Sequence, residues 1–159
     1  ILGTLILPTL AIYTGAPFFG WAKPVPIDLR NLKNGRRDYA LVAAAGPMAN
    51  LFLALVATAL LFVQVRLPFN HRLLETTQIF SVVSIQVNLM LAFFNLLPIA
   101  PLDGFNVIQG VLPGRWALSL SKLARFSGLI LIILLLTGGF RLLAIPVSLA
   151  MRFLLSFVS

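Results

Sequence analysis

The feature that most constrains the fold of this chain is a pair of long segments that contain no charged residue. The first runs from Tyr39 to Val65 and the second from Thr76 to Leu102. A helix crosses the hydrocarbon core of a bilayer with about 20 residues, so each segment is long enough to span it. Hydrophobic residues make up 60% of the sequence and charged residues only 10%, whereas soluble domains are about a quarter charged. The sequence therefore predicts an integral membrane protein.

The order of apolar runs and breakers predicts an all-α polytopic fold that forms one domain over residues 1–159. We expect about four to five transmembrane helices, at residues 1–14, 38–65, 76–97, 116–137 and 142–158. Within residues 15–37, Pro17, Pro24 and Pro26 exclude a regular helix. A short β-ribbon at the cytoplasmic interface is expected there, and a short helix is expected after Asp103.

The net charge of +8 could indicate a nucleic-acid-binding surface, but the basic residues lie in short loops between apolar runs. Residues 15–37 and 98–125 are rich in Lys and Arg, and residues 66–75 are poorer. Because Lys and Arg favour the cytoplasmic side, this alternation places the first and third of these segments in the cytoplasm. We expect a multi-pass protein of a prokaryotic plasma membrane, in contact with the lipid bilayer and without a nucleic-acid partner.

Asp103 is the only charged residue between Glu75 and Arg115. A carboxylate at membrane depth costs roughly 2.5–3.5 kcal/mol on insertion scales, so it needs a metal, a cation or helix amides as a partner. One interpretation is that Asp103 caps a helix beginning at Gly104. The other is that Asp103 binds a metal ion, and a single carboxylate can do both.

Two expected spans carry small or polar residues at helical spacing, which places each set on one helix face. The later set is Gln78, Ser81, Ser84, Asn88, Ala92 and Asn95, and the earlier set is Ala43, Gly46 or Pro47, Asn50, Ala54 and Ala57. Such faces meet protein or water rather than lipid. Helix packing explains most of these residues, but it explains Asn50 and Asn95 less well.

Three motifs resemble those of site-2 proteases, a family of intramembrane zinc metalloproteases. Asn95, Pro98, Pro101, Asp103 and Gly104 resemble the family's Asn-Pro-Pro-Asp-Gly motif, and Ala45-Gly46-Pro47-x-x-Asn50 resembles its AGPxxN motif. The segment FGWAKPVP at residues 19–26 is similar to that of the short prokaryotic members. The motifs occur in the family's order, so the resemblance covers nearly the whole chain.

The resemblance implies hydrolysis of peptide bonds in a membrane-embedded protein or peptide, near the cytoplasmic face, with one Zn²⁺ ion as cofactor. Asp103 would be a zinc ligand, and Asn50 and Asn95 would contact the substrate or the developing oxyanion. The expected substrate-binding residues are Phe19, Gly20, Trp21, Ala22, Lys23 and Pro24.

The departure from the family is the absence of an HExxH motif, which would supply two histidine ligands and the catalytic glutamate. The only histidine is His71, in a loop expected to face away from Asp103. We therefore expect an N-terminally truncated protein, inactive as this chain alone. The alternatives are a non-catalytic membrane protein or a small cation-binding transporter, and a structural assembly module would be favoured if Asp103 were dispensable.

Overall fold

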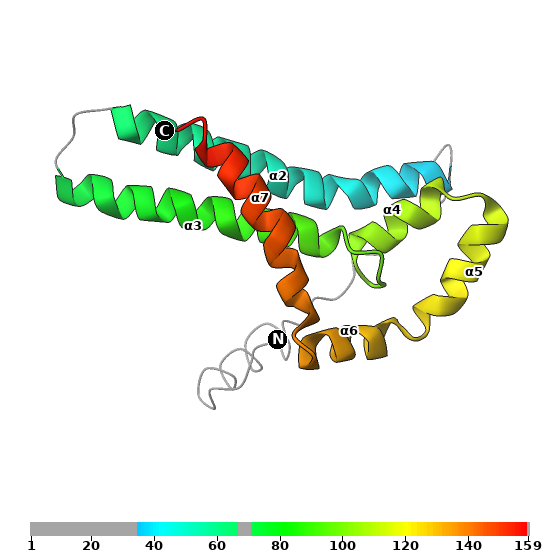
Figure 1. Ribbon diagram of the computed structural model, residues 1–159. Helices are drawn as coiled ribbons and strands as arrows, with labels where there is room; N and C mark the ends of the chain where they lie inside the picture. Colours follow the sequence, from blue (N-terminus) through cyan, green and yellow to red (C-terminus); the bar gives the residue numbers. More distant parts are fainter. Residues whose placement is uncertain (1–34, 67–70, 159) are drawn as a thin grey trace, which may run out of the picture. The chain divides into compact units, whose positions relative to one another are not determined.

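The computed structural model describes residues 35–66 and 71–158, which belong to one unit, Leu32–Ser159 (Figure 1). Regular structure within these ranges is entirely helical. The α-helices are α2 (Arg36–Arg66), α3 (His71–Asn95), α4 (Asp103–Val111), α5 (Gly114–Ala124), α6 (Ser127–Leu136) and α7 (Ala144–Leu155), and a 3₁₀ helix, η3 (Gly139–Leu143), precedes α7. The expected helix at 1–14 and nearly all of the 15–37 ribbon lie outside the described residues.

Helices α2 and α3 lie side by side and antiparallel (Figure 1). Two segments, Arg36–Arg66 and Leu74–Asn95, are long and apolar enough to cross a membrane, which supports a membrane protein. The prediction of a loop over residues 66–75 is wrong at its second half, because α3 already begins at His71. The nearest helix breaker, Pro68, precedes this point, and residues 71–75 contain neither proline nor glycine.

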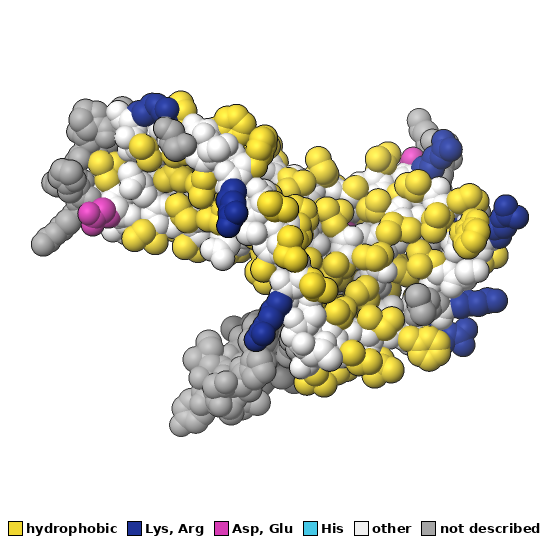
Figure 2. Space-filling model, viewed as in Figure 1, with side chains coloured by type: hydrophobic (Ala, Val, Ile, Leu, Met, Phe, Trp, Pro, Cys, Tyr) yellow, Lys and Arg dark blue, Asp and Glu magenta, His cyan; other side chains and the backbone are white. Residues whose placement is uncertain are grey.

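The core of the unit forms where α7 crosses the pair of α2 and α3 (Figure 1). Ala54 and Ala57 of α2 are buried there against Ile85 of α3 and Val147 of α7. Small side chains on α2 allow close approach of the helices, so the predicted small face of this span is confirmed for the buried alanines. Large apolar side chains point outward over most of α2 and α3, and Figure 2 shows hydrophobic side chains over much of the visible face.

The span predicted at residues 116–137 is not one unbroken helix. Helices α5 and α6 bend by 62° where they meet, at Arg125 and Phe126. Helix α6 has ten residues and is about 15 Å long, half the thickness of a hydrocarbon core. The predicted helix at 142–158 is present as α7. Within the described ranges, two helices could span a membrane, or three if the bent pair is one span, so the count of four to five is not confirmed.

Candidate metal and substrate site

Asp103 is the first residue of α4, the short helix predicted after it. Residues Leu96–Leu102 form a compact turn between α3 and α4, in which the amide of Leu102 donates to the carbonyl of Ile99 at 2.9 Å. Leu102 has extended backbone angles and is the N-cap of α4, and no side-chain cap is present. The interpretation of Asp103 as an N-cap is therefore wrong, because its own backbone is already helical.

The carboxylate of Asp103 lies against Gly46 of α2. A Cβ built on Gly46 would be 2.9 Å from Oδ2 of Asp103, so glycine leaves the space that this oxygen uses. Among the described residues, Asp103 has no hydrogen bond or ion pair. The fold thus joins the Asp-Gly motif to the AGPxxN motif.

Two glycines hold α4 close to its neighbours. A Cβ on Gly104 would be 2.1 Å from the carbonyl oxygen of Leu96, and one on Gly110 would be 2.4 Å from Cβ of Ala40. At the end of α4, the guanidinium of Arg36 donates to the carbonyls of Gln109 and, at 3.1 Å, Leu112. A cation suits a helix C-terminus. The apolar pattern of the sequence does not predict these contacts, although two glycines in a nine-residue helix are a signal of close packing.

The two candidate asparagines are close in the chain to the residues that contact α4, and no hydrogen bond joins either of them to Asp103. Asn50 follows Gly46 by one helical turn, about 6 Å along α2 and on the same face. Asn95 ends α3 and precedes Leu96, whose carbonyl contacts Gly104. In the part of the chain that the structure describes, neither amide side chain has a hydrogen-bond partner. Both are half-buried and free to bind another molecule.

On α3, the half of the polar face that is farther from Asp103 is explained by packing within the protein. Ser81 is buried and donates to Oε1 of Gln64 on α2 at 3.2 Å. The amide of Asn88 donates to the carbonyl of Ser84 in its own helix at 2.9 Å. These contacts favour the packing interpretation for this part of the face, and only its end at Asn95 approaches Asp103.

The described residues by themselves do not fit a zinc site. Over residues 35–66 and 71–158, no three His, Cys, Asp or Glu side chains are grouped to hold a metal, and structural or catalytic zinc needs at least three protein ligands. His71 begins α3, and Asn95 ends it, so they are separated by about 36 Å of helix. The predicted substrate-binding residues 19–24 lie outside the described part.

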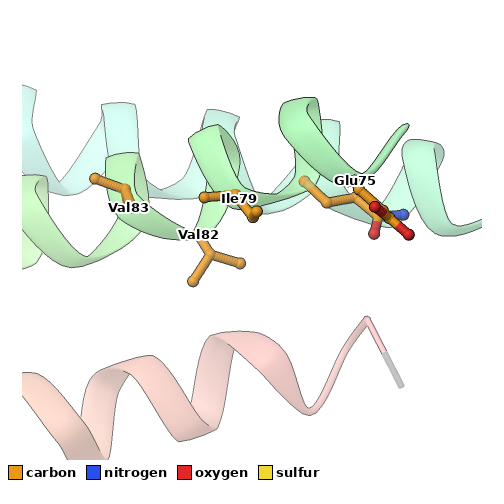
Figure 3. Close-up of a pocket in the computed structure, with 5 residues that line it drawn as sticks. Glu75, Ile79, Val82 and Val83 are labelled. Atoms are coloured by element: carbon orange, nitrogen blue, oxygen red, sulfur yellow. The ribbon is translucent and has the colours of Figure 1, made fainter. Parts of the chain in front are cut away.

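Two hollows on the surface lie away from Asp103. One is lined by Glu75, Gln78, Ile79, Val82 and Val83 of α3 (Figure 3), where Val82 points toward the C-terminal helix. The other lies between α3, η3 and α7 and includes Gln86 and Arg141. Neither contains a candidate catalytic residue, so the Asp103 region is defined by contacts between helices and not by either hollow.

The chain is 34% identical over 122 residues to "Putative zinc metalloprotease YwhC" of Bacillus subtilis (strain 168). The aligned region is 75% of this chain but 55% of the relative, so the chain spans little more than half of that protein. No protein-family model matches the chain, and no solved structure matches it significantly. Over three quarters of its length, the chain is thus similar to part of a protein named as a putative zinc metalloprotease.

Proposed function

We propose that this chain is part of a site-2-protease-type intramembrane zinc metalloprotease, which cleaves membrane-embedded proteins or peptides near the cytoplasmic face. The contact between the Asp103 carboxylate and Gly46 carries the proposal. It brings together two motifs that are more than 50 residues apart in the sequence, and it places the only charged side chain of the 76–114 segment at their junction. The similarity to a protein named as a zinc metalloprotease supports the same reaction class.

The depth of Asp103 supports cleavage within the membrane. Gly46 lies ten residues after Arg36, which is about 15 Å along α2. The side chains of Leu41 and Val42, between these two points, are exposed and apolar, as expected for lipid-facing residues. The carboxylate is therefore recessed from the cationic end of α2, and a substrate peptide bond would have to reach it from within the bilayer.

Each residue of the proposed site has a defined task. Asp103 supplies one anionic oxygen ligand, and two histidine ligands and a general base would come from an HExxH helix outside this sequence. A zinc ion held there would polarise the carbonyl and activate water. Asn50 and Asn95 donate amide hydrogens to the substrate carbonyl or the developing oxyanion. Residues Phe19–Pro24 hold the substrate extended by strand addition, because the hydrogen bonds of a helix shield its peptide bonds.

One observation favours a second candidate, a small cation-binding transporter. Asp103 is a lone carboxylate with no partner among the described residues, and such a group in a membrane protein often marks an ion pathway. A non-catalytic relative of the proteases would show the same geometry. The transporter predicts cation flux through reconstituted vesicles and no cleavage of a membrane substrate.

The test replaces Asp103 with Asn in the complete protein, and Glu75→Gln is the control. Both substitutions remove a carboxylate, but exposed Glu75 lies at the far end of α3. We expect Asp103→Asn to lose zinc and cleavage, and its Tm to match that of the zinc-free wild-type protein, since Asp103 caps no helix. Asn50→Ala and Asn95→Ala should retain zinc and lower turnover by about 100-fold, the effect of removing one oxyanion donor.

Zinc content, cleavage of a membrane substrate and thermal unfolding are measured for all variants. Full cleavage by Asp103→Asn would refute the assignment of this residue. Cation flux that depends on Asp103, in a wild-type protein that cleaves nothing, would favour the transporter.

A further inference from the structure

Helix α5 has the pattern of a helix that lies in a membrane interface. Arg115, Ser119 and Lys122 are spaced at four and three residues and share one face, and Trp116 and Leu120 share a neighbouring face, about 110° around the helix. Trp116 is 60% exposed, so the described part of the protein leaves most of this ring uncovered. A cationic face beside an aromatic and aliphatic face suits a helix that lies at the level of the lipid headgroups. Exposed Leu118 is the exception to the pattern.

Contacts place α5 at the cationic end of the unit. The side-chain amide of Gln109 in α4 donates to the hydroxyl of Ser121 in α5, and the carbonyl of Gln109 accepts from Arg36 at the start of α2. Figure 2 shows Lys and Arg side chains gathered where α2 begins and α4 ends. The sequence contains no acidic residue after Asp103, so no carboxylate in α5 or in a later helix neutralises Arg115 and Lys122.

After α6 the chain reaches the end of α3 and not the opposite end of the α2–α3 pair. The bend of 62° separates α5 from α6. The ring of Phe140, in the 3₁₀ helix after α6, packs against Phe94 with centroids 5.4 Å apart. Phe94 precedes the last residue of α3, at the end of the helix pair where α4 begins. Helix α5 therefore stays at the cationic end, where Gln109 contacts Ser121, and α6 leads from it to the level of the end of α3.

We propose that α5 binds the anionic phospholipid headgroups of the leaflet at this end, with Arg115 and Lys122 facing the phosphates and Trp116 inserted among the acyl chains. Charge complementarity selects the partner, because every charged residue of α5 is a cation. Interfacial tryptophan accounts for the exposed ring. This proposal does not depend on the protease assignment, because neither Asp103 nor zinc takes part in it.

The experiment measures quenching of Trp116 by brominated lipid in a Trp21→Phe background, which leaves one tryptophan in the chain. The protein is reconstituted in vesicles of phosphatidylcholine with a minor, constant fraction of phosphatidylglycerol, and one or the other lipid is brominated. We expect quenching per brominated phosphatidylglycerol to exceed quenching per brominated phosphatidylcholine several-fold, and the excess to fall at high salt, since salt screens the attraction.

The double variant Arg115→Gln/Lys122→Gln should remove the excess. Arg66→Gln/Arg152→Gln removes the same charge from exposed positions outside α5 and should leave it unchanged. Equal quenching by both lipids in the unsubstituted protein would overturn the proposal, and so would absence of quenching. An excess that survives in the Arg115/Lys122 variant would also overturn it. The salt dependence needs no substitution at α5, so the test does not depend on how the variant folds.

Discussion

Replacement of Gly46 with Ala tests the proposed site through the residue that makes room for it. An alanine Cβ would lie 2.9 Å from Oδ2 of Asp103, whereas ordinary contact begins at 3.4 Å. The carboxylate would therefore have to move by about 0.5 Å, and it can do so by rotation because it ends a flexible side chain. Metal sites hold ligand distances within about 0.2 Å, so this displacement is large for a ligand.

The stability of the fold should change little or rise. Alanine in a helix interior is favoured over glycine by roughly 0.5–1 kcal/mol, and this gain offsets the cost of rotating Asp103. Function should respond in the opposite direction. We expect the complete protein with Gly46→Ala to lose about 10-fold to 100-fold in zinc affinity and cleavage, the range seen when supporting contacts of a metal site are lost.

The assay compares zinc content, cleavage of a membrane substrate and Tm in detergent for Gly46→Ala and Gly128→Ala. Gly128 lies in α6, and a Cβ there would meet nothing within 4 Å, so it controls for the general effect of alanine in a helix. Wild-type cleavage by Gly46→Ala with Tm unchanged would refute the reasoning that Asp103 acts from its place against Gly46. A lower Tm would show that the carboxylate cannot rotate away.

Gly104→Ala should lower the free energy of unfolding by about 1–3 kcal/mol or more, as overpacking does, because the new Cβ would be 2.1 Å from a backbone oxygen. Denaturant unfolding measures this loss, and an unchanged midpoint would contradict the close packing of α4. In the same assay, Arg36→Gln should lower the free energy of unfolding by about 0.3–1 kcal/mol, because it removes a cation from the end of α4. Arg37→Gln, at the neighbouring exposed position, should lower it less. The chain has no cysteine, so single cysteines report topology. A membrane-impermeant thiol reagent should label position 71 in intact cells and leave positions 34 and 114 protected, and the reverse pattern would overturn the cytoplasmic placement of α5.

The long uncharged segments made two of the helices predictable from sequence. Their bounds were predicted to within a few residues, except at the start of α3, because hydrophobic length alone decides whether a helix can cross a bilayer. The small face of α2 was also predictable from one segment alone. Alanines at helical spacing leave a surface on which another helix can pack, and Ala54 and Ala57 are buried there. Asp103 stood out because a charge is costly among apolar residues.

Length and hydropathy could not predict the path of residues 114–143. The apolar run from Leu129 to Leu136 is compatible with a span, but the bend after α5 and the contact of Phe140 with Phe94 depend on packing between segments far apart in the sequence. The same limit applies to the N-cap interpretation of Asp103, since an Asp before Gly fits a cap or a first helical residue equally well. Only the backbone of Leu102 distinguishes the two.

The sequence by itself therefore determined that this protein lies in a lipid bilayer and which residues are costly to bury in it. Both follow from the chemistry of each segment. The tertiary structure decided which motifs meet. Gly46 and Asp103 come together because glycines at 104 and 110 let α4 approach α3 and α2, and Arg36 holds its far end. That arrangement is a property of close contacts between backbones, which no single segment specifies.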